Sequence, residues 1–103
     1  MTESLQLNLV ANVTKFSYDA LVSKRDKLLK RLLSKPTDFT WEELVTVMKG
    51  FDYELKTTGG SGRKFIDPNT RATAFLHEPH PGKILKAYQI RDIVSHLKQE
   101  KKI

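Results

Sequence analysis

Residues 40–65 read TWEELVTVMKGFDYELKTTGGSGRKF, and the spacing of the apolar side chains changes within this stretch at Gly50. Before Gly50, apolar residues recur three and four positions apart, which is the spacing of one helical face. They are Trp41, Leu44, Val45 and Met48. After it, Phe51, Tyr53 and Leu55 alternate with charged residues. Because strand side chains alternate between two faces, this pattern predicts a half-buried strand directly after the helix.

The helix carries signals at both ends. Thr40 and Glu43 have the spacing of a capping box, in which each side chain accepts a hydrogen bond from a backbone N–H of the first turn. Phe39 and Leu44 occupy the positions of a hydrophobic staple. We expect Gly50 to end the helix in the left-handed conformation, as glycine commonly does.

The remainder of the chain predicts two further strands and a helix. A glycine-rich turn at residues 57–62 leads into a strand at Arg63–Asp67, and a turn at residues 68–70 leads into a strand at Ala72–His77. Residues 78–82 contain two prolines and are expected to be irregular. A last helix follows, with a buried stripe formed by Ile90, Ile93, Val94 and Leu97.

This order predicts an α+β fold with a three-stranded antiparallel sheet. Three short hairpin-linked strands need a covering layer, so we expect the helices on one face of the sheet and water on the other. An extra N-terminal helix is predicted from Ser17 and should end before Pro36, which disfavours helical geometry in the preceding residue. We therefore divide the chain into a basic helical extension, residues 1–36, and a main domain, residues 37–103.

The chain is basic, with 18 Lys and Arg against 12 Asp and Glu and a net charge of +6. Residues 1–36 contribute +4 of it, from 7 basic and 3 acidic residues. A basic surface attracts polyanions, so nucleic acid leads the expected partners, against the alternative of a basic protein with no such partner. For the N-terminal helix we favour a solvated basic face over docking on nucleic acid or an anionic membrane.

Length and composition exclude several classes of protein. A chain of 103 residues can bury one core, and 39% hydrophobic residues are too many for a disordered chain. The absence of cysteine excludes a disulfide scaffold, cysteine-ligated metal sites and a cysteine nucleophile. Residues 1–16 lack the pattern of a signal peptide, and no apolar run reaches the length of a membrane span. We expect a cytoplasmic protein with no membrane contact.

The glycine-rich turn is the first candidate site. Lys64 is followed by Phe65, which excludes a Walker loop, and no helix follows, which excludes a dinucleotide fingerprint. Glycines still let backbone amides approach a phosphate, and Arg63 and Lys64 add positive charge beside Gly60 and Ser61. An ordinary hairpin turn is the alternative.

The second candidate is the loop that carries His77 and His80. Pro79 and the three-residue spacing exclude the helical zinc-protease pattern, and we expect neither a metal nor another cofactor. Either histidine could act as a general acid or base, or simply be bonded to backbone or water.

Three further positions near the last helix could contact RNA. Lys83 and Lys86 lie close to Tyr88, and an aromatic ring flanked by lysines can contact RNA. The alternative is that Tyr88 anchors the helix to the sheet. His96, among polar neighbours, is expected to be exposed.

Taken together, these elements resemble the HicA family, the mRNA-interferase toxins of bacterial and archaeal toxin–antitoxin pairs. The resemblance runs from about residue 38 to residue 99. It rests on Trp41–Leu44, Met48–Phe51, the Gly60–Ser61 turn, Arg63–Phe65, His80–Lys83 and the closing helix, in that order. It implies a double-stranded-RNA-binding-domain-like fold, mRNA binding, metal-independent endoribonuclease activity and an antitoxin partner of HicB type.

The chain departs from the family motif at one position. The family reads Gly-Ser-His, with the histidine catalytic, and here the aligned residue is Gly62. Metal-free RNA cleavage needs a base for the 2′-hydroxyl, an acid for the leaving oxygen and a positive group at the phosphate. His77 or His80 would have to transfer the proton. The expected RNA-binding residues are Gly60, Ser61, Arg63, Lys64, Lys83 and Lys86.

Three functions follow from these observations. The first is an RNA-cleaving toxin held by an antitoxin. The second is a catalytically silent RNA-binding module. The third is an interaction protein that uses the helix at residues 17–34 as its docking face.

Overall fold

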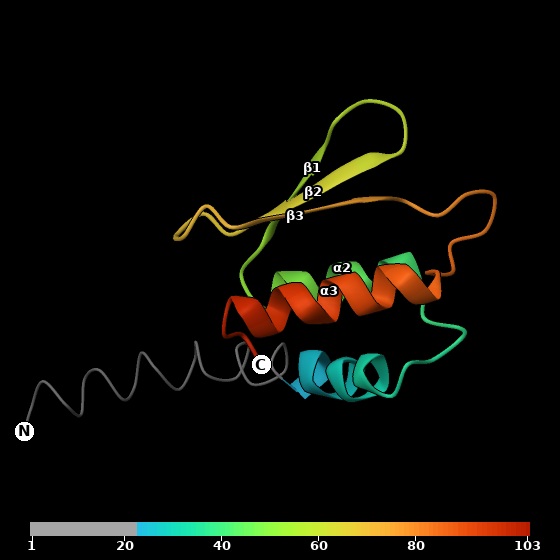
Figure 1. Cartoon of the computed structure of the whole chain (residues 1–103), viewed down its shortest axis with the longest axis horizontal. Coiled ribbons are helices and arrows are strands. Elements are labelled where there is room, and N and C mark those ends of the chain that lie inside the picture. The colour runs from blue at the N-terminus through green and yellow to red at the C-terminus, as the bar shows by residue number, and fades with distance from the viewer. Residues whose placement is uncertain (1–22) are drawn as a thin grey trace, which may run out of the picture.

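The computed structural model describes residues 23–103 and has the α+β architecture expected from the sequence (Figure 1). The named elements are α2 (Trp41–Gly50), β1 (Glu54–Thr57), β2 (Gly62–Ile66), β3 (Thr73–His77) and α3 (Ala87–Gln99). Residues 23–33 form a helix that precedes them. Residues 1–22 lie outside the described residues. They include residues 17–22 of the predicted N-terminal helix and residues 1–16, which lack the pattern of a signal peptide.

The strands form one antiparallel sheet in the order β1-β2-β3. Helices α2 and α3 lie side by side on the same face of this sheet, and the helix at residues 23–33 lies on the far side of them (Figure 1). The predicted one-sided cover is therefore confirmed. None of the helices within residues 23–103 is both long and apolar enough to cross a membrane.

The strand register determines which side chains face the helices. Leu55 pairs with Phe65, and Phe65 pairs in turn with Ala74. Phe65 and Ala74 are buried, so this row faces the helices. The alternate residues point the other way, and we call their surface the outer face. Its members are Glu54, Lys56, Gly62, Lys64, Ile66, Thr73, Phe75 and His77.

The strand ends differ slightly from those predicted. Phe51 caps α2, so β1 begins only at Glu54. Gly62, predicted to lie in the turn, is the first residue of β2. Asp67 falls outside β2, because its carboxylate accepts a hydrogen bond from the N–H of Asn69 at 2.9 Å and bends the chain into the turn.

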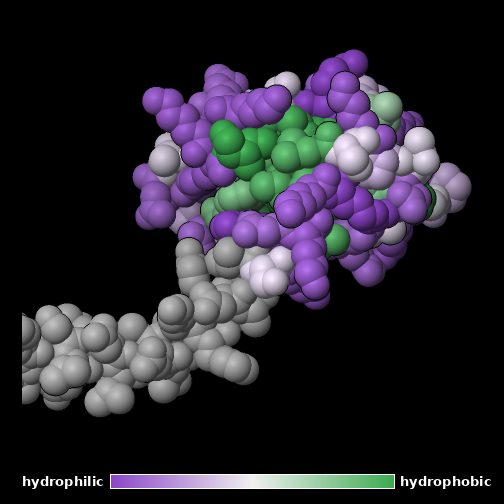
Figure 2. Space-filling model, turned by 90° about the horizontal axis from the view of Figure 1, so that it is seen from below, coloured by the Kyte–Doolittle hydropathy of each residue, from purple (hydrophilic) through white to green (hydrophobic). Residues whose placement is uncertain are grey.

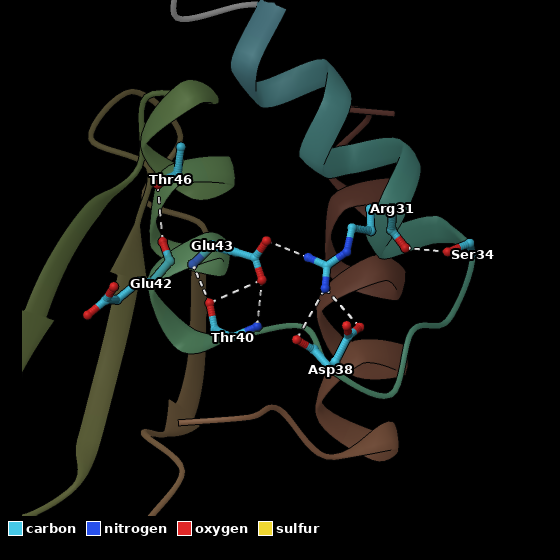
Figure 3. Close-up of polar contacts among 7 residues, drawn as sticks. All are labelled: Arg31, Ser34, Asp38, Thr40, Glu42, Glu43 and Thr46. Carbon is cyan, nitrogen blue, oxygen red and sulfur yellow. Dashed lines mark hydrogen bonds and ion pairs between the residues drawn. The ribbon is translucent and has the colours of Figure 1, made fainter. Parts of the chain in front are cut away.

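The predicted capping box of α2 is confirmed and extends to the N-terminal helix (Figure 3). The N–H of Glu43 donates to Thr40 Oγ1 at 3.2 Å, and the N–H of Thr40 donates to Glu43 Oε1 at 3.0 Å. Arg31 donates to the other oxygen of Glu43 and, at 2.8 Å, to Asp38. Burial opposes ionisation of Glu43, but the hydrogen bonds from Arg31 and Thr40 hold its pKa below the ordinary value.

The expectation for Gly50 is wrong. Gly50 is the last residue of α2, Phe51 is the cap, and Asp52 takes the left-handed conformation with φ of 68°. Glycine is needed at position 50 for close packing instead: a Cβ there would lie 2.8 Å from the Cβ of Arg25. The Arg25 guanidinium also donates to the Gly50 carbonyl at 3.2 Å and lies over the ring of Phe51.

The core lies between the sheet and the helices. Trp41, only 4% exposed, packs its ring at 39° against Phe65, with 5.5 Å between ring centroids. The staple residues Phe39 and Leu44 are fully buried. Leu32 is fully buried in the same cluster, so the described part of the N-terminal extension packs on the main domain.

A buried ion pair joins the turn after β2 to the C-terminal residues. Asp67 is almost fully buried and accepts a hydrogen bond from Lys102 Nζ at 2.7 Å. Together with the N–H of Asn69, this bond lowers the pKa of Asp67 to about 2. The carboxylate is therefore ionised in the folded protein throughout the ordinary pH range.

The predicted exposure of His96 is also wrong. Its ring is half-buried, and Nε2 lies 2.8 Å from the hydroxyl of Tyr53. Burial, with the charges of Asp67 and Glu100, raises the pKa of Tyr53 to about 12, so the hydroxyl stays protonated. Burial lowers the pKa of His96.

Replacing Trp41 with alanine tests the core. The cavity left against Phe65 should lower the free energy of unfolding by about 3–5 kcal/mol, which urea titration measures. The milder Trp41→Phe serves as a control, because it keeps an aromatic ring. A loss below about 1 kcal/mol for Trp41→Ala would contradict the burial described above.

Replacing Asp67 with asparagine tests the buried ion pair. The folded-state pKa is depressed, so the carboxylate stabilises the protein above its unfolded pKa near 4, and this contribution is lost as the pH falls toward 2. Asp67→Asn should be less stable than the wild type at pH 7, and the difference should shrink between pH 4 and pH 2. Thermal unfolding across this range is the measurement. A difference that does not change with pH would contradict the assignment.

Candidate functional site

The glycine-rich turn is held in shape by the side chain that follows it. Gly59 and Gly60 have φ of 82° and 52°, a conformation that favours glycine. The Arg63 guanidinium donates to the carbonyls of Gly60 at 2.9 Å and Gly62 at 2.8 Å, and to Glu78 at 3.1 Å. Its side chain is only 18% exposed. Arg63, predicted to contact RNA, thus lies where it fixes the turn.

The structure brings His77 to this turn. His77 is the direct register partner of Gly62, and both belong to the outer face. The hydroxyl of Ser61 lies 3.1 Å from His77 Nδ1, and the N–H of Glu78 donates to the Ser61 carbonyl at 2.8 Å. The predicted residues Ser61, Gly62 and His77 therefore form one cluster, although His77 is far from the other two in the sequence.

His77 is also fixed from the helix side. The buried side chain of Gln89 in α3 donates to the His77 carbonyl at 2.8 Å, and its oxygen accepts the N–H of Lys86 at 3.0 Å. The start of α3 and the end of β3 are thereby tied together.

The other predicted site residues lie farther along the chain. His80 is exposed in the irregular segment, three residues beyond the last ladder pair of β3. Lys83 is exposed, with Nζ 3.8 Å from Glu42. Its carbonyl accepts the N–H of Trp41 at 2.7 Å, so its backbone belongs to the helix side of the molecule. Tyr88 is 49% exposed, so it does not anchor α3 in the core.

Two residues of the outer face were missed in the sequence. Lys56 is the register partner of Lys64, and both are exposed. Phe75 in β3 is 53% exposed and is the other register partner of Lys64. Its ring packs edge-to-face against the His77 ring, with 5.2 Å between the ring centroids. The alternation of side chains along β3 could have revealed Phe75 as an outer-face residue. It places Phe75 on the face opposite to that of the buried residues Ala74 and Leu76.

Gly62 has room for a side chain only after a neighbour moves. Its φ lies outside the left-handed region, so its backbone suits any residue. A Cβ there would lie 2.2 Å from Thr58 Oγ1 and 3.4 Å from the Phe75 ring. The obstacle is therefore a threonine hydroxyl on the exposed turn, which a rotation about χ1 can move.

The opposite side of the molecule has an apolar groove between residues 32–37 and α3. Its volume is about 600 Å³. Figure 2 shows an apolar area on this side with polar residues around it. The groove is lined by apolar residues that include Leu32, Leu33, Pro36, Leu85, Ile90 and Val94, and by the basic residues Lys35, Arg91 and Lys98.

The comparisons with known proteins identify the family. The model of the HicA toxin of bacterial toxin–antitoxin systems matches residues 41–100, which is more than half of the chain. The chain belongs to the HicA family. A comparison with curated proteins and one with solved structures gave no match. Membership in HicA implies a toxin with an antitoxin partner.

The HicA match covers α2, the whole sheet and α3, and therefore the cluster of Ser61, Gly62 and His77. The helix at residues 23–33 and Lys102 lie outside the match, although both contribute buried contacts to the fold. Within residues 23–103 no three His, Asp or Glu side chains gather as they would around a metal ion.

Gly62→His tests the steric account of this position. Because the backbone is permissive and Thr58 blocks the site, Gly62→His should fold but melt at a lower temperature than the wild type. Adding Thr58→Ala should recover part of the loss, and Thr58→Ala alone is the control. Equal melting temperatures for Gly62→His with and without Thr58→Ala would contradict the account.

Proposed function

We propose that this HicA protein binds RNA in the cytoplasm and cleaves it without a metal ion, with His77 in place of the family histidine and a HicB-type antitoxin as its partner. The observation that supports this proposal is the register pair Gly62 and His77 on the outer face. Directly paired residues on one face of a sheet have Cβ atoms about 5 Å apart, so a histidine at 77 reaches the space above position 62.

His77 has the surroundings that a general base needs. Ser61 Oγ lies 3.1 Å from Nδ1 and can accept a hydrogen bond from it. The proposal places the ring hydrogen on Nδ1, which leaves Nε2 as the nitrogen that accepts a proton. The bond from Gln89 to the His77 backbone and the position of Ser61 fix where the ring can lie. Ser61 acts here as a positioning residue.

The reaction then follows the chemistry of the 2′-hydroxyl. His77 Nε2 takes the 2′-proton, the 2′-oxygen attacks the adjacent phosphorus, and the bond from phosphorus to the 5′-oxygen breaks as a water molecule gives that oxygen a proton. The imidazolium of His77 then returns its proton to the hydroxide that this water leaves. The products are a 2′,3′-cyclic phosphate and a 5′-hydroxyl end. Lys64 supplies positive charge beside the phosphate on the same face. Arg63 keeps the turn in shape rather than binding RNA itself.

A second candidate function is protein docking through the apolar groove between residues 32–37 and α3. The specific observation is an apolar floor with Lys35, Arg91 and Lys98 among its lining residues, which suits an acidic amphipathic segment of a partner protein. This function is compatible with the first, because the groove and the outer face lie on opposite sides of α2 and α3.

The test compares two histidine variants on a single-stranded RNA in the presence of EDTA. His77→Ala should lower the cleavage rate by about 10²–10⁴-fold, which is the usual contribution of one general base to a reaction rate. The RNA affinity of this variant should stay within a few-fold of the wild-type value. His80→Ala is the matched control and should cut like the wild type.

A rescue variant sharpens this test. Adding Gly62→His and Thr58→Ala to His77→Ala returns a histidine to the family position and should restore part of the cleavage. Cleavage by His77→Ala at the wild-type rate would contradict the role of His77. A wild-type protein that binds RNA but leaves it intact would support the catalytically silent module instead.

A further inference from the structure

Phe75 is the most unusual residue of the outer face. It is a large apolar side chain with 53% of its surface exposed, in the middle of β3, on the face that α2 and α3 leave open. Its neighbours along the strand, Ala74 and Leu76, are buried on the other face. The core therefore does not account for a phenylalanine at this position.

The ring lies next to two members of the candidate catalytic cluster, His77 and Gly62. It contacts His77 edge-to-face, with 5.2 Å between ring centroids and 83° between planes. Two of its carbon atoms lie 3.4 Å from the place that a Cβ of residue 62 would take. Phe75 thus borders the space in which the scissile phosphate would lie next to His77.

The charge around the ring is positive. Lys64 is the register partner of Phe75, and Lys56 is the register partner of Lys64, so the two lysines extend in a row from the ring across the sheet. Both are exposed. The outer face also carries an acidic residue, Glu54. It lies two residues before Lys56 in β1, opposite Ile66, and so away from the row of lysines. The exposed ring suits the flat base of a nucleotide, and the row of lysines that starts next to it suits the anionic phosphates.

We propose that Phe75 is a stacking platform for one unpaired base beside the scissile phosphate, with Lys64 and Lys56 binding the phosphates that follow it. The inference rests on the proposed function, since it needs RNA on the outer face. A base can lie flat on a side chain only when it is out of a duplex, so the platform selects single-stranded RNA. Phenylalanine has no hydrogen-bonding group, so it does not distinguish the four bases.

The test measures binding alone, with a probe that the protein cannot cut. The single-stranded probe is a fluorescent 2′-O-methyl oligoadenylate, which lacks the free 2′-hydroxyl required for cleavage. The duplex probe is the same strand paired with 2′-O-methyl oligouridylate. Anisotropy at low salt gives the affinity of the full-length protein for each probe.

The variants separate stacking from apolar contact. Phe75→Leu keeps apolar bulk but loses the aromatic face, so it should bind the single strand about five- to a hundredfold more weakly, with little change for the duplex. Phe75→Tyr keeps the ring and should bind like the wild type. Because residue 75 is exposed, both variants should melt close to the wild type, which a thermal scan checks.

Three other outcomes would contradict the proposed RNA binding, the stacking platform or both. A wild-type protein that binds neither probe would overturn the proposed RNA-binding function together with this inference. Unchanged single-strand affinity in Phe75→Leu would overturn the stacking platform and leave the proposed function standing. Unchanged RNA affinity with lost binding of the antitoxin would assign the ring to a protein contact and overturn the inference.

Discussion

The burial of Phe65 under Trp41 is the constraint on which the rest of the structure depends. Phe65 lies at the centre of the middle strand and is fully buried. A slip of one residue in a strand would exchange its two faces, so burial of this ring fixes the register of the whole sheet. Lys64 is then forced outward, and so are its partners Lys56 and Phe75. The chemistry of the outer face is a consequence of what the inner face must bury.

The local signals of the fold were readable in the sequence, because they act within a few residues. The capping box of Thr40 and Glu43 and the staple of Phe39 and Leu44 need only one turn of helix. The sequence-based predictions were wrong where a residue far away in the sequence makes the deciding contact. Gly50 faces Arg25, which is 25 residues away, and no local pattern reports that approach. His96 is bonded to Tyr53 across 43 residues for the same reason.

The candidate site shows the same division. The sequence shows the glycine turn, Lys64 and His77 only as separate motifs. Their proximity depends on the β2–β3 register, which pairs Gly62 with His77, 15 positions along the chain. Phe75 was overlooked, since an aromatic residue in a strand is usually read as core. The guanidinium of Arg63 also looked available for a ligand. Its three hydrogen bonds to the turn and to Glu78 appear only in three dimensions.

The contact between Arg31 and the cap of α2 has a consequence for how the chain can be shortened. Arg31 and Leu32 precede the residues matched by the family, and Lys102 follows them. A fragment cut to residues 41–100 would lose the counter-ion of Glu43, the packing of Leu32 and the partner of Asp67. The family match therefore covers less than the part of the chain that packs together, and we expect the cooperative unit of unfolding to extend beyond the match at both ends.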